Sequence, residues 1–170
     1  MNLKDYIYDV PNYPKEGILF RDITPLLKSK EAFEYAVKEM ADFVKKCGAT
    51  VIMGPESRGF IFGCPVAYEA DLGFVPIRKP GKLPRETIEE NYELEYGTNT
   101  LCIHSDSLKK GDKVVIVDDL LATGGTLEAA IKLAEKCGAE VVGITCVIEL
   151  NDLKGREKLK NVNIKTLINY

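Results

Sequence analysis

The segment covering residues 114–126 limits most strongly what this chain can fold into. It opens with four branched apolar residues, Val114–Val117, which are typical of a strand buried on both faces. Asp118 and Asp119 follow, and a turn with two glycines and two threonines then opens a helix over residues 127–137. Strand, turn and helix in this order predict a βαβ unit, and therefore an α/β fold with a parallel sheet.

The same alternation of strands and helices extends along the rest of the chain. Apolar residues at helical spacing predict a helix over residues 29–47, which Ser29 would cap and Gly48 would end. Residues 58–71 predict another helix, in which Pro65 would form a kink. Short apolar runs predict strands at residues 50–53, 72–77, 100–104, 113–117, 140–148 and 164–168. We expect one domain, residues 1–170, with a central mostly parallel sheet flanked by helices.

Residues 81–99 interrupt this alternation. They are polar, mixed in charge and flanked by prolines, which predicts a long excursion from the core. Long loops in compact domains are uncommon and often act as lids. Residues 92–97 alternate in polarity, which indicates a strand or an exposed hairpin within the excursion.

The composition excludes several classes of protein. With 170 residues, 23 Lys and Arg and 26 Asp and Glu, the chain has a net charge of −3, so general nucleic-acid binding is not expected. No apolar run reaches the length of a membrane helix, and no signal segment is recognisable. The five cysteines form no Cys-x-x-Cys pair and His104 stands alone, so we expect reduced thiols, a cytoplasmic protein and no Cys/His metal site.

The turn after the central strand has the properties of a phosphate site. Its glycines let the backbone approach a ligand, and the helix start offers free N–H groups to an anion. A Walker loop would need Lys where Gly125 stands, and the Gly-x-Gly-x-x-Gly pattern is absent. The two preceding carboxylates suit vicinal hydroxyls or Mg²⁺. Together these features predict a ribose 5-phosphate ligand, against the alternative of an acidic turn with a glycine-rich helix entry.

Two further segments carry cations near predicted strand ends. Arg58, in residues 56–60, would either bind pyrophosphate oxygens as a fork or be an ordinary surface cation. Residues 78–85 hold four cations and no acid, so they form either a solvated loop or a mobile clamp on a leaving group. Near the amino end, Phe20 would either join the core or stack on a flat base.

Taken together, these motifs resemble the adenine phosphoribosyltransferase family, a branch of the type I phosphoribosyltransferases, in order and spacing. The matching segments are residues 20–25, 56–60, 78–84, 94–97 and 118–126, with a similar tail at 149–159. Two departures are mild, since Glu56 stands where some members have Asp and Pro80 where others have Arg.

The resemblance implies a type I fold with a small amino-terminal base-binding hood and a flexible catalytic loop. It implies that adenine and phosphoribosyl pyrophosphate (PRPP) give AMP and pyrophosphate, a purine-salvage reaction. Mg²⁺ would be held mainly by PRPP, with Asp118 and Asp119 as candidate protein ligands. The implied assembly is a homodimer in the cytoplasm, with small-molecule substrates and neither nucleic acid nor membrane as a partner.

The resemblance also implies a role for each matching residue. The 5-phosphate would be held by Ala122, Thr123, Gly124, Gly125 and Thr126, and the pyrophosphate by Ser57, Arg58, Arg78, Lys79 and Lys82. Adenine would contact Leu19, Phe20, Arg21 and Leu121, and the catalytic residues would be Glu95, Asp118 and Asp119. Arg78 would reach toward the site of a neighbouring subunit.

Three alternatives compete with this interpretation. The first is a phosphoribosyltransferase for hypoxanthine, guanine or xanthine, which product formation with each base would distinguish. The second is a PRPP-sensing regulator. Such a regulator should carry a DNA-binding extension, and we expect the residues before Phe20 to be too few to form one. The third is a nucleotide-binding structural module, which would need neither the basic segment nor Glu95.

Overall fold

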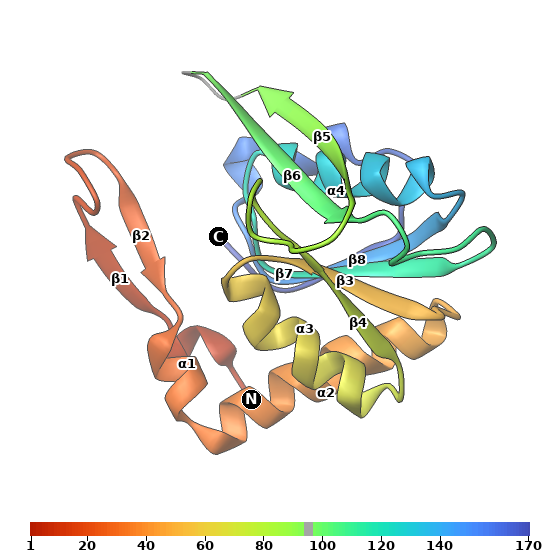
Figure 1. The fold of residues 1–170 in the computed structure, drawn as a ribbon. Coiled ribbons are helices and arrows are strands. Elements are labelled where there is room, and N and C mark those ends of the chain that lie inside the picture. Colours follow the sequence, from red (N-terminus) through yellow and green to blue (C-terminus); the bar gives the residue numbers. More distant parts are fainter. Residues whose placement is uncertain (94–96) are drawn as a thin grey trace.

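A five-stranded parallel sheet forms the centre of the computed structural model, which describes residues 1–93 and 97–170. Its strands lie in the order β4-β3-β7-β8-β9 (Figure 1). The strand bounds are β3 Val51–Pro55, β4 Gly73–Ile77, β7 Lys113–Leu121, β8 Glu140–Glu149 and β9 Ile164–Asn169. The predicted α/β fold with a parallel central sheet is confirmed.

Helices cover both faces of this sheet, as the alternation in the sequence predicted. On one face lie α1 (Thr24–Lys28), α2 (Lys30–Lys46) and α3 (Arg58–Glu69), and on the other lies α4 (Gly125–Lys136) (Figure 1). The side chain of Ser29 caps α2 by accepting a hydrogen bond from the Ala32 N–H. Two clusters of buried apolar side chains, one on each face of the sheet, make up the core.

The excursion between β4 and β7 is more regular than expected. Strand β5 (Thr87–Glu93) pairs antiparallel with β6 (Thr98–His104), and this hairpin lies on the same side of the sheet as α4 (Figure 1). The prediction of a loop was therefore wrong for residues 87–91, because cross-strand hydrogen bonds and side chains such as the buried Ile103 give them a regular partner. The strand expected over residues 92–97 is confirmed for Tyr92 and Glu93, and residues 94–96 lie outside the described residues.

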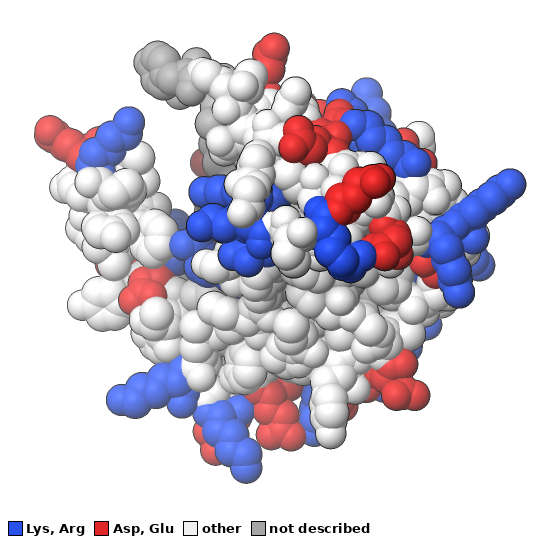
Figure 2. All heavy atoms as spheres, viewed as in Figure 1, with Lys and Arg blue, Asp and Glu red and all other residues white. Residues whose placement is uncertain are grey.

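The amino-terminal residues form a small unit beside the sheet, which we call the hood. After the 3-10 helix η1 (Leu3–Tyr6), strand β1 (Tyr8–Pro11) pairs antiparallel with β2 (Leu19–Asp22). The hairpin stands apart from the body, with an open gap between them (Figures 1 and 2). Within the described residues, no helix is long and apolar enough to cross a bilayer.

The strand order locates the place where a ligand should bind. Consecutive strands β3 and β4 lie to one side of β7, whereas β8 and β9 lie to the other side. The direction of winding therefore reverses between β3 and β7. In open α/β sheets, ligands bind at the carboxyl ends of the two strands that flank such a switch point.

Candidate active site

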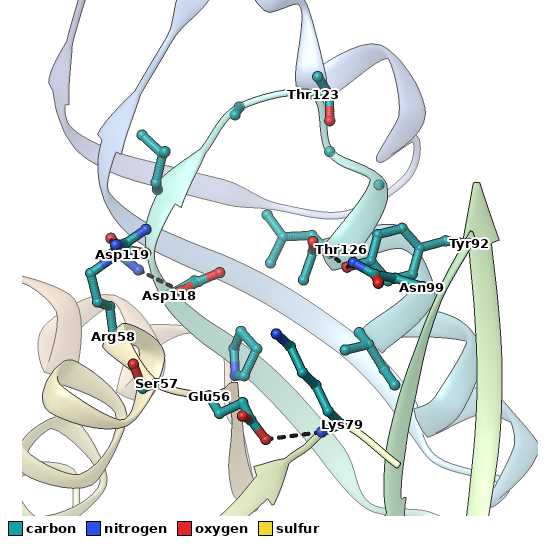
Figure 3. Close-up of a pocket in the computed structure, with 17 residues that line it drawn as sticks. Glu56, Ser57, Arg58, Lys79, Tyr92, Asn99, Asp118, Asp119, Thr123 and Thr126 are labelled. Carbon is teal, nitrogen blue, oxygen red and sulfur yellow. Dashed lines mark hydrogen bonds and ion pairs between the residues drawn. The ribbon is translucent and has the colours of Figure 1, made fainter. Parts of the chain in front are cut away.

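A cavity of about 490 Å³ opens at the carboxyl ends of β3 and β7, where the switch point lies (Figure 3). Its walls come from four parts of the chain: the end of β3 with the start of α3, the basic segment, the β5–β6 hairpin, and the end of β7 with the turn into α4. The lining residues are Pro55, Glu56, Ser57, Arg58, Lys79, Tyr92, Asn99, Leu101, Asp118, Asp119, Leu120, Ala122, Thr123, Gly124, Gly125, Thr126 and Leu127.

The turn from β7 to α4, which we call the phosphate loop (residues 122–126), lines this cavity over its whole length. Gly124 has a φ of 90° and caps α4, a conformation that L side chains rarely adopt. The first N–H groups of a helix lack partners within the helix and favour an anion. All five residues predicted to hold the 5-phosphate are therefore together at a helix start.

The boundary of the preceding strand differs from the prediction. The sequence placed its end at Val117, but β7 runs on to Leu121, which pairs in register with Glu149 of β8. Asp118 and Asp119 thus lie within the strand. Aspartate is usually depleted in strands, but the neighbouring parallel strand supplies backbone partners that override this preference.

The two aspartates are buried at the floor of the cavity. Asp118 and Asp119 are 9% and 8% exposed, and the Asp119 N–H donates to Oδ1 of Asp118 over 2.8 Å. Burial, followed by the negative charge of Asp119, raises the pKa of Asp118 well above its ordinary value. Burial and the neighbouring charge therefore disfavour the ionised form of Asp118.

Arg58 is joined to the predicted ribose site. Its Nε atom lies 2.6 Å from Oδ2 of Asp119, although the two residues are 61 positions apart. The next residue, Gly59, also packs closely against the site, because a Cβ there would lie 2.7 Å from Cδ of Pro55 and 3.1 Å from Oδ1 of Asp118. The Arg58 guanidinium also lies 5.7 Å from the centre of the Phe20 ring, so it links the body to the hood.

The predicted pyrophosphate residues divide into two groups. Ser57, Arg58 and Lys79 line the cavity, and Lys79 extends into its open space (Figure 3). Arg78 and Lys82 lie outside the lining: Nε of Arg78 donates to Glu56 over 3.1 Å, and Lys82 is exposed. Figure 2 shows Lys and Arg side chains gathered on the body beside the gap that faces the hood.

The predicted adenine residues lie on the hood and beneath the cavity, outside its lining. Leu19 is 47% exposed, and the Phe20 ring packs edge-on against Tyr13 at 5.2 Å between centroids. Arg21 pairs with Asp9 at 2.5 Å. Leu121 is fully buried in the core, whereas its neighbour Leu120 lines the cavity. The predicted proton partner, Glu95, lies outside the described residues.

Sequence reasoning gave no site role to several residues that line the cavity. Glu56 accepts hydrogen bonds from the Lys79 N–H at 2.9 Å and from Arg78, and the first of these is the main reason that the pKa of Glu56 is lowered. Tyr92 and Asn99 project from the hairpin, and the Thr126 hydroxyl donates to the Tyr92 hydroxyl over 3.3 Å. The Glu56 contact joins segments about 22 positions apart, so no local signal could reveal it.

The residues at this site fit a divalent cation that arrives with a ligand. Within the described residues, no three metal-binding side chains cluster together, so the chain does not provide a complete cage. The buried carboxyl groups of Asp118 and Asp119 nevertheless suit a hard cation such as Mg²⁺, which prefers oxygen ligands and retains waters and ligand phosphates in its coordination shell.

Comparisons with known proteins agree with the fold. Residues 27–169 match the phosphoribosyl transferase domain family. The adenine phosphoribosyltransferase of Thermoanaerobacter pseudethanolicus is 50% identical, with a TM-score of 0.96 and coverage of 99% of this chain and 98% of that chain. The adenine phosphoribosyltransferase of Rhodothermus marinus is 46% identical, with a TM-score of 0.93 and coverage of 99% and 96%. That of Saccharomyces cerevisiae is 40% identical, with a TM-score of 0.92 and coverage of 97% and 96%.

The parallel sheet, the phosphate loop and the acidic pair at the switch point define a type I phosphoribosyltransferase. Identity of 40–50% over almost the whole chain narrows this class further. The chain belongs to the adenine phosphoribosyltransferase family.

Proposed function

We propose that the protein uses the cavity at the ends of β3 and β7 to transfer the 5-phosphoribosyl group of PRPP to N9 of adenine, giving AMP and pyrophosphate. One observation carries this proposal: the phosphate loop and the acidic pair share one cavity in a chain 50% identical to an adenine phosphoribosyltransferase. The Saccharomyces cerevisiae protein was crystallised with adenine and an imino-sugar bisphosphate, a pair of ligands consistent with this assignment.

The roles of the residues follow from charge and position. The phosphate loop offers N–H groups to the 5-phosphate, and Asp118 and Asp119 accept hydrogen bonds from the ribose hydroxyls. Lys79 and Arg58 face the pyrophosphate. Among the described residues, Asp119 engages only Nε of Arg58, so the two terminal nitrogens remain available for phosphate oxygens.

This chemistry requires no covalent nucleophile. Departure of pyrophosphate leaves positive charge on the sugar ring, as in other glycosyl transfers. The protein must neutralise the leaving group, hold the base in line and exclude water. Mg²⁺, when bound with PRPP beside Asp118 and Asp119, would add positive charge to the leaving group. The hairpin β5–β6, whose Tyr92 and Asn99 line the cavity, is the element placed to cover the reacting atoms.

The gap between hood and body supports the choice of a flat base. Phe20, on the hood strand β2, lies within cation–π distance of Arg58 at the edge of the cavity. A base placed there would have the ribose site on one side and an aromatic ring on the other. Backbone groups of the hood would then select adenine, because a 6-oxopurine presents an acceptor where adenine presents its amino group.

The assay that tests this proposal measures nucleotide formation from PRPP and Mg²⁺ with each purine base in turn. We expect AMP to form at least about a hundredfold faster than the products from hypoxanthine, guanine or xanthine. Comparable rates with a 6-oxopurine would remove the adenine assignment and keep the phosphoribosyltransferase class. No product with any base would remove the activity itself.

We also propose that the chain forms a homodimer through α3. Ile61, Cys64 and Tyr68 lie on one side of this helix at three- and four-residue spacing, and all three are exposed. A stripe of this kind on an outer helix suits a second copy of the same chain. Because α3 begins at Arg58, such a contact would lie close to the active site.

A further inference from the structure

The tail segment, residues 149–159, lies directly behind the phosphate loop, and the mechanism above does not use it. After β8 the chain passes through two 3-10 helices, η2 (Asn151–Leu153) and η3 (Gly155–Lys158). A Cβ on Gly155 would lie 2.5 Å from the carbonyl oxygen of Ala122, and a Cβ on Gly124 would lie 2.7 Å from the carbonyl oxygen of Gly155. The two backbones therefore pack directly against each other, and Gly155 forms the rear support of the loop.

The residue after this glycine anchors it to the sheet. Nε of Arg156 donates to both carboxylate oxygens of Glu149, at 2.8 and 3.1 Å, and a terminal nitrogen donates to Oε1 at 2.9 Å. Glu149 is only 7% exposed, and it also accepts the Thr166 hydroxyl at 2.9 Å. A buried carboxylate with several charge-assisted donors is held in one orientation.

The same carboxylate belongs to the strand next to the loop. Glu149 pairs in register with Leu121, the residue before the phosphate loop, and the Leu150 N–H donates to the Leu121 carbonyl over 3.0 Å. The ion pair thus joins the end of β8 to the segment that carries Gly155. At the far end of the tail, Leu159 is buried in the core on the α4 side. The tail is fixed at both ends, with the loop resting between them.

We propose that the Glu149–Arg156 pair is a positioning element for the phosphate loop. By holding Gly155 against Ala122 and Gly124, it presets the backbone N–H groups for the 5-phosphate, so less ordering is needed when the ligand binds. This inference rests on the proposed function, since it assigns the phosphate of PRPP and AMP to that loop. Loss of the ion pair should weaken the binding of ligands that carry a 5-phosphate and leave the binding of ligands without one unchanged.

The test compares ligands with and without that phosphate on the full chain. For Arg156→Ala we expect the Kd values of AMP and of ribose 5-phosphate, measured by calorimetry, to rise about tenfold, while the Kd of adenosine stays the same. The KM for PRPP should rise with little change in kcat. Arg156→Lys keeps the charge without the fork and should give an intermediate loss, so it also tests the idea if the alanine variant does not fold.

The control is Glu39→Gln, which removes the carboxylate of a more exposed ion pair, with Lys165 on β9, at 3.0 Å and away from the loop. It should leave all three Kd values unchanged. Unchanged AMP and ribose 5-phosphate binding in both Arg156 variants would overturn the proposal, and so would equal weakening of adenosine. If the wild type binds ribose 5-phosphate but not AMP, the adenine assignment fails. The effect of the Arg156 variants on ribose 5-phosphate binding then still tests the role of the Glu149–Arg156 pair. If the wild type binds neither ligand, both the proposed function and the role of the Glu149–Arg156 pair are overturned.

Discussion

At the scale of single residues, this site combines groups that would be unfavourable elsewhere in the protein. Asp118 is buried beside another carboxylate, and Gly124 holds a backbone conformation that other residues avoid. Each feature reduces the stability of the fold. In return, Asp118 offers an acceptor for ligand hydroxyls, and the turn at Gly124 exposes backbone N–H groups. Substitutions here should therefore separate activity from stability.

Asp118→Asn should reduce activity without reducing stability. Burial places the native pKa of Asp118 well above its unfolded value. Between these two pKa values the unfolded carboxyl is ionised and the native one is not, so the free energy of unfolding falls as the pH rises. The amide can keep the hydrogen bond from the Asp119 N–H, but it cannot supply a second anionic acceptor. We expect kcat for AMP formation to fall about a hundredfold and the free energy of unfolding at pH 8 to rise by about 1 kcal/mol.

Denaturation at two pH values checks this expectation, because the stability gain should shrink toward pH 4, where the carboxyl of the unfolded wild-type chain also becomes protonated. A variant that is less stable than wild type at pH 8, or that turns over at the wild-type rate, would show that the acidic pair has a structural role instead.

Glu149→Gln should show the opposite dependence on pH. Pairing with Arg156 lowers the pKa of Glu149 below its unfolded value, so the carboxylate stabilises the native state above pH 4.5. That contribution is lost as the pH falls through the lowered native value. We expect a loss of about 1 kcal/mol at pH 7, since Arg156 is half-exposed. Urea denaturation from pH 7 to pH 3 measures it, and a difference that persists unchanged at pH 3 contradicts the assignment.

At the scale of secondary-structure elements, local signals predicted most of the sheet and helices. The spacing of apolar residues and the Ser29 cap placed α2 within one residue at each end. The hood hairpin was not predicted from local pattern, because β1 and β2 have only four residues each, too few for a clear periodic signal. The end of β7 was missed because its regularity depends on β8, whose pairing residues lie 28 positions further along the chain.

The candidate site shows the same division between local and distant signals. The sequence predicted that residues 122–126 lie between a strand end and a helix start, because a strand, glycines and a helix are contiguous there, and their binding of a 5-phosphate stays a prediction. The Arg58–Asp119 and Glu56–Lys79 contacts were not predicted, because each depends on strand order. The support from Gly155 to the loop depends on a segment that follows the next strand.

The basic segment should act through position rather than through total charge. Lys79 lines the cavity, whereas Nη1 of Arg85 lies 2.7 Å from Asp106, outside the cavity lining. We expect Lys79→Ala to raise the KM for PRPP about tenfold at low salt, and less at about 0.5 M salt, because screening weakens the wild-type interaction. Arg85→Ala removes the same charge and should change KM less than about twofold. Equal effects of the two variants would mean that the segment attracts PRPP only through its general field.

At the scale of the whole molecule, the carboxyl edge of the sheet and the β5–β6 hairpin line one cavity, and the hood stands apart beside the body (Figure 1). The net charge of −3 conceals this arrangement, since Lys and Arg side chains gather beside the gap (Figure 2) and backbone N–H groups carry no formal charge. Affinity for one small anionic sugar therefore needs no basic protein. The hood is joined to the carboxyl end of the chain, where the Arg21 guanidinium stacks on the Tyr170 ring at 3.7 Å.

The outer face of α3 gives the last prediction, which concerns assembly. Tyr68 is 88% exposed, so the isolated fold gains little from it, and a charge at this position should leave the free energy of unfolding of a single chain unchanged. In a dimer formed through α3, two copies of Tyr68→Glu would bring like charges into an apolar contact. We expect sedimentation velocity to show a dimer for wild type and a monomer for Tyr68→Glu. The control is Tyr35→Glu, on α2, which is 38% exposed and should remain dimeric. A monomeric wild type would contradict the dimer itself, and a dimeric Tyr68→Glu would move the interface to another face of the molecule.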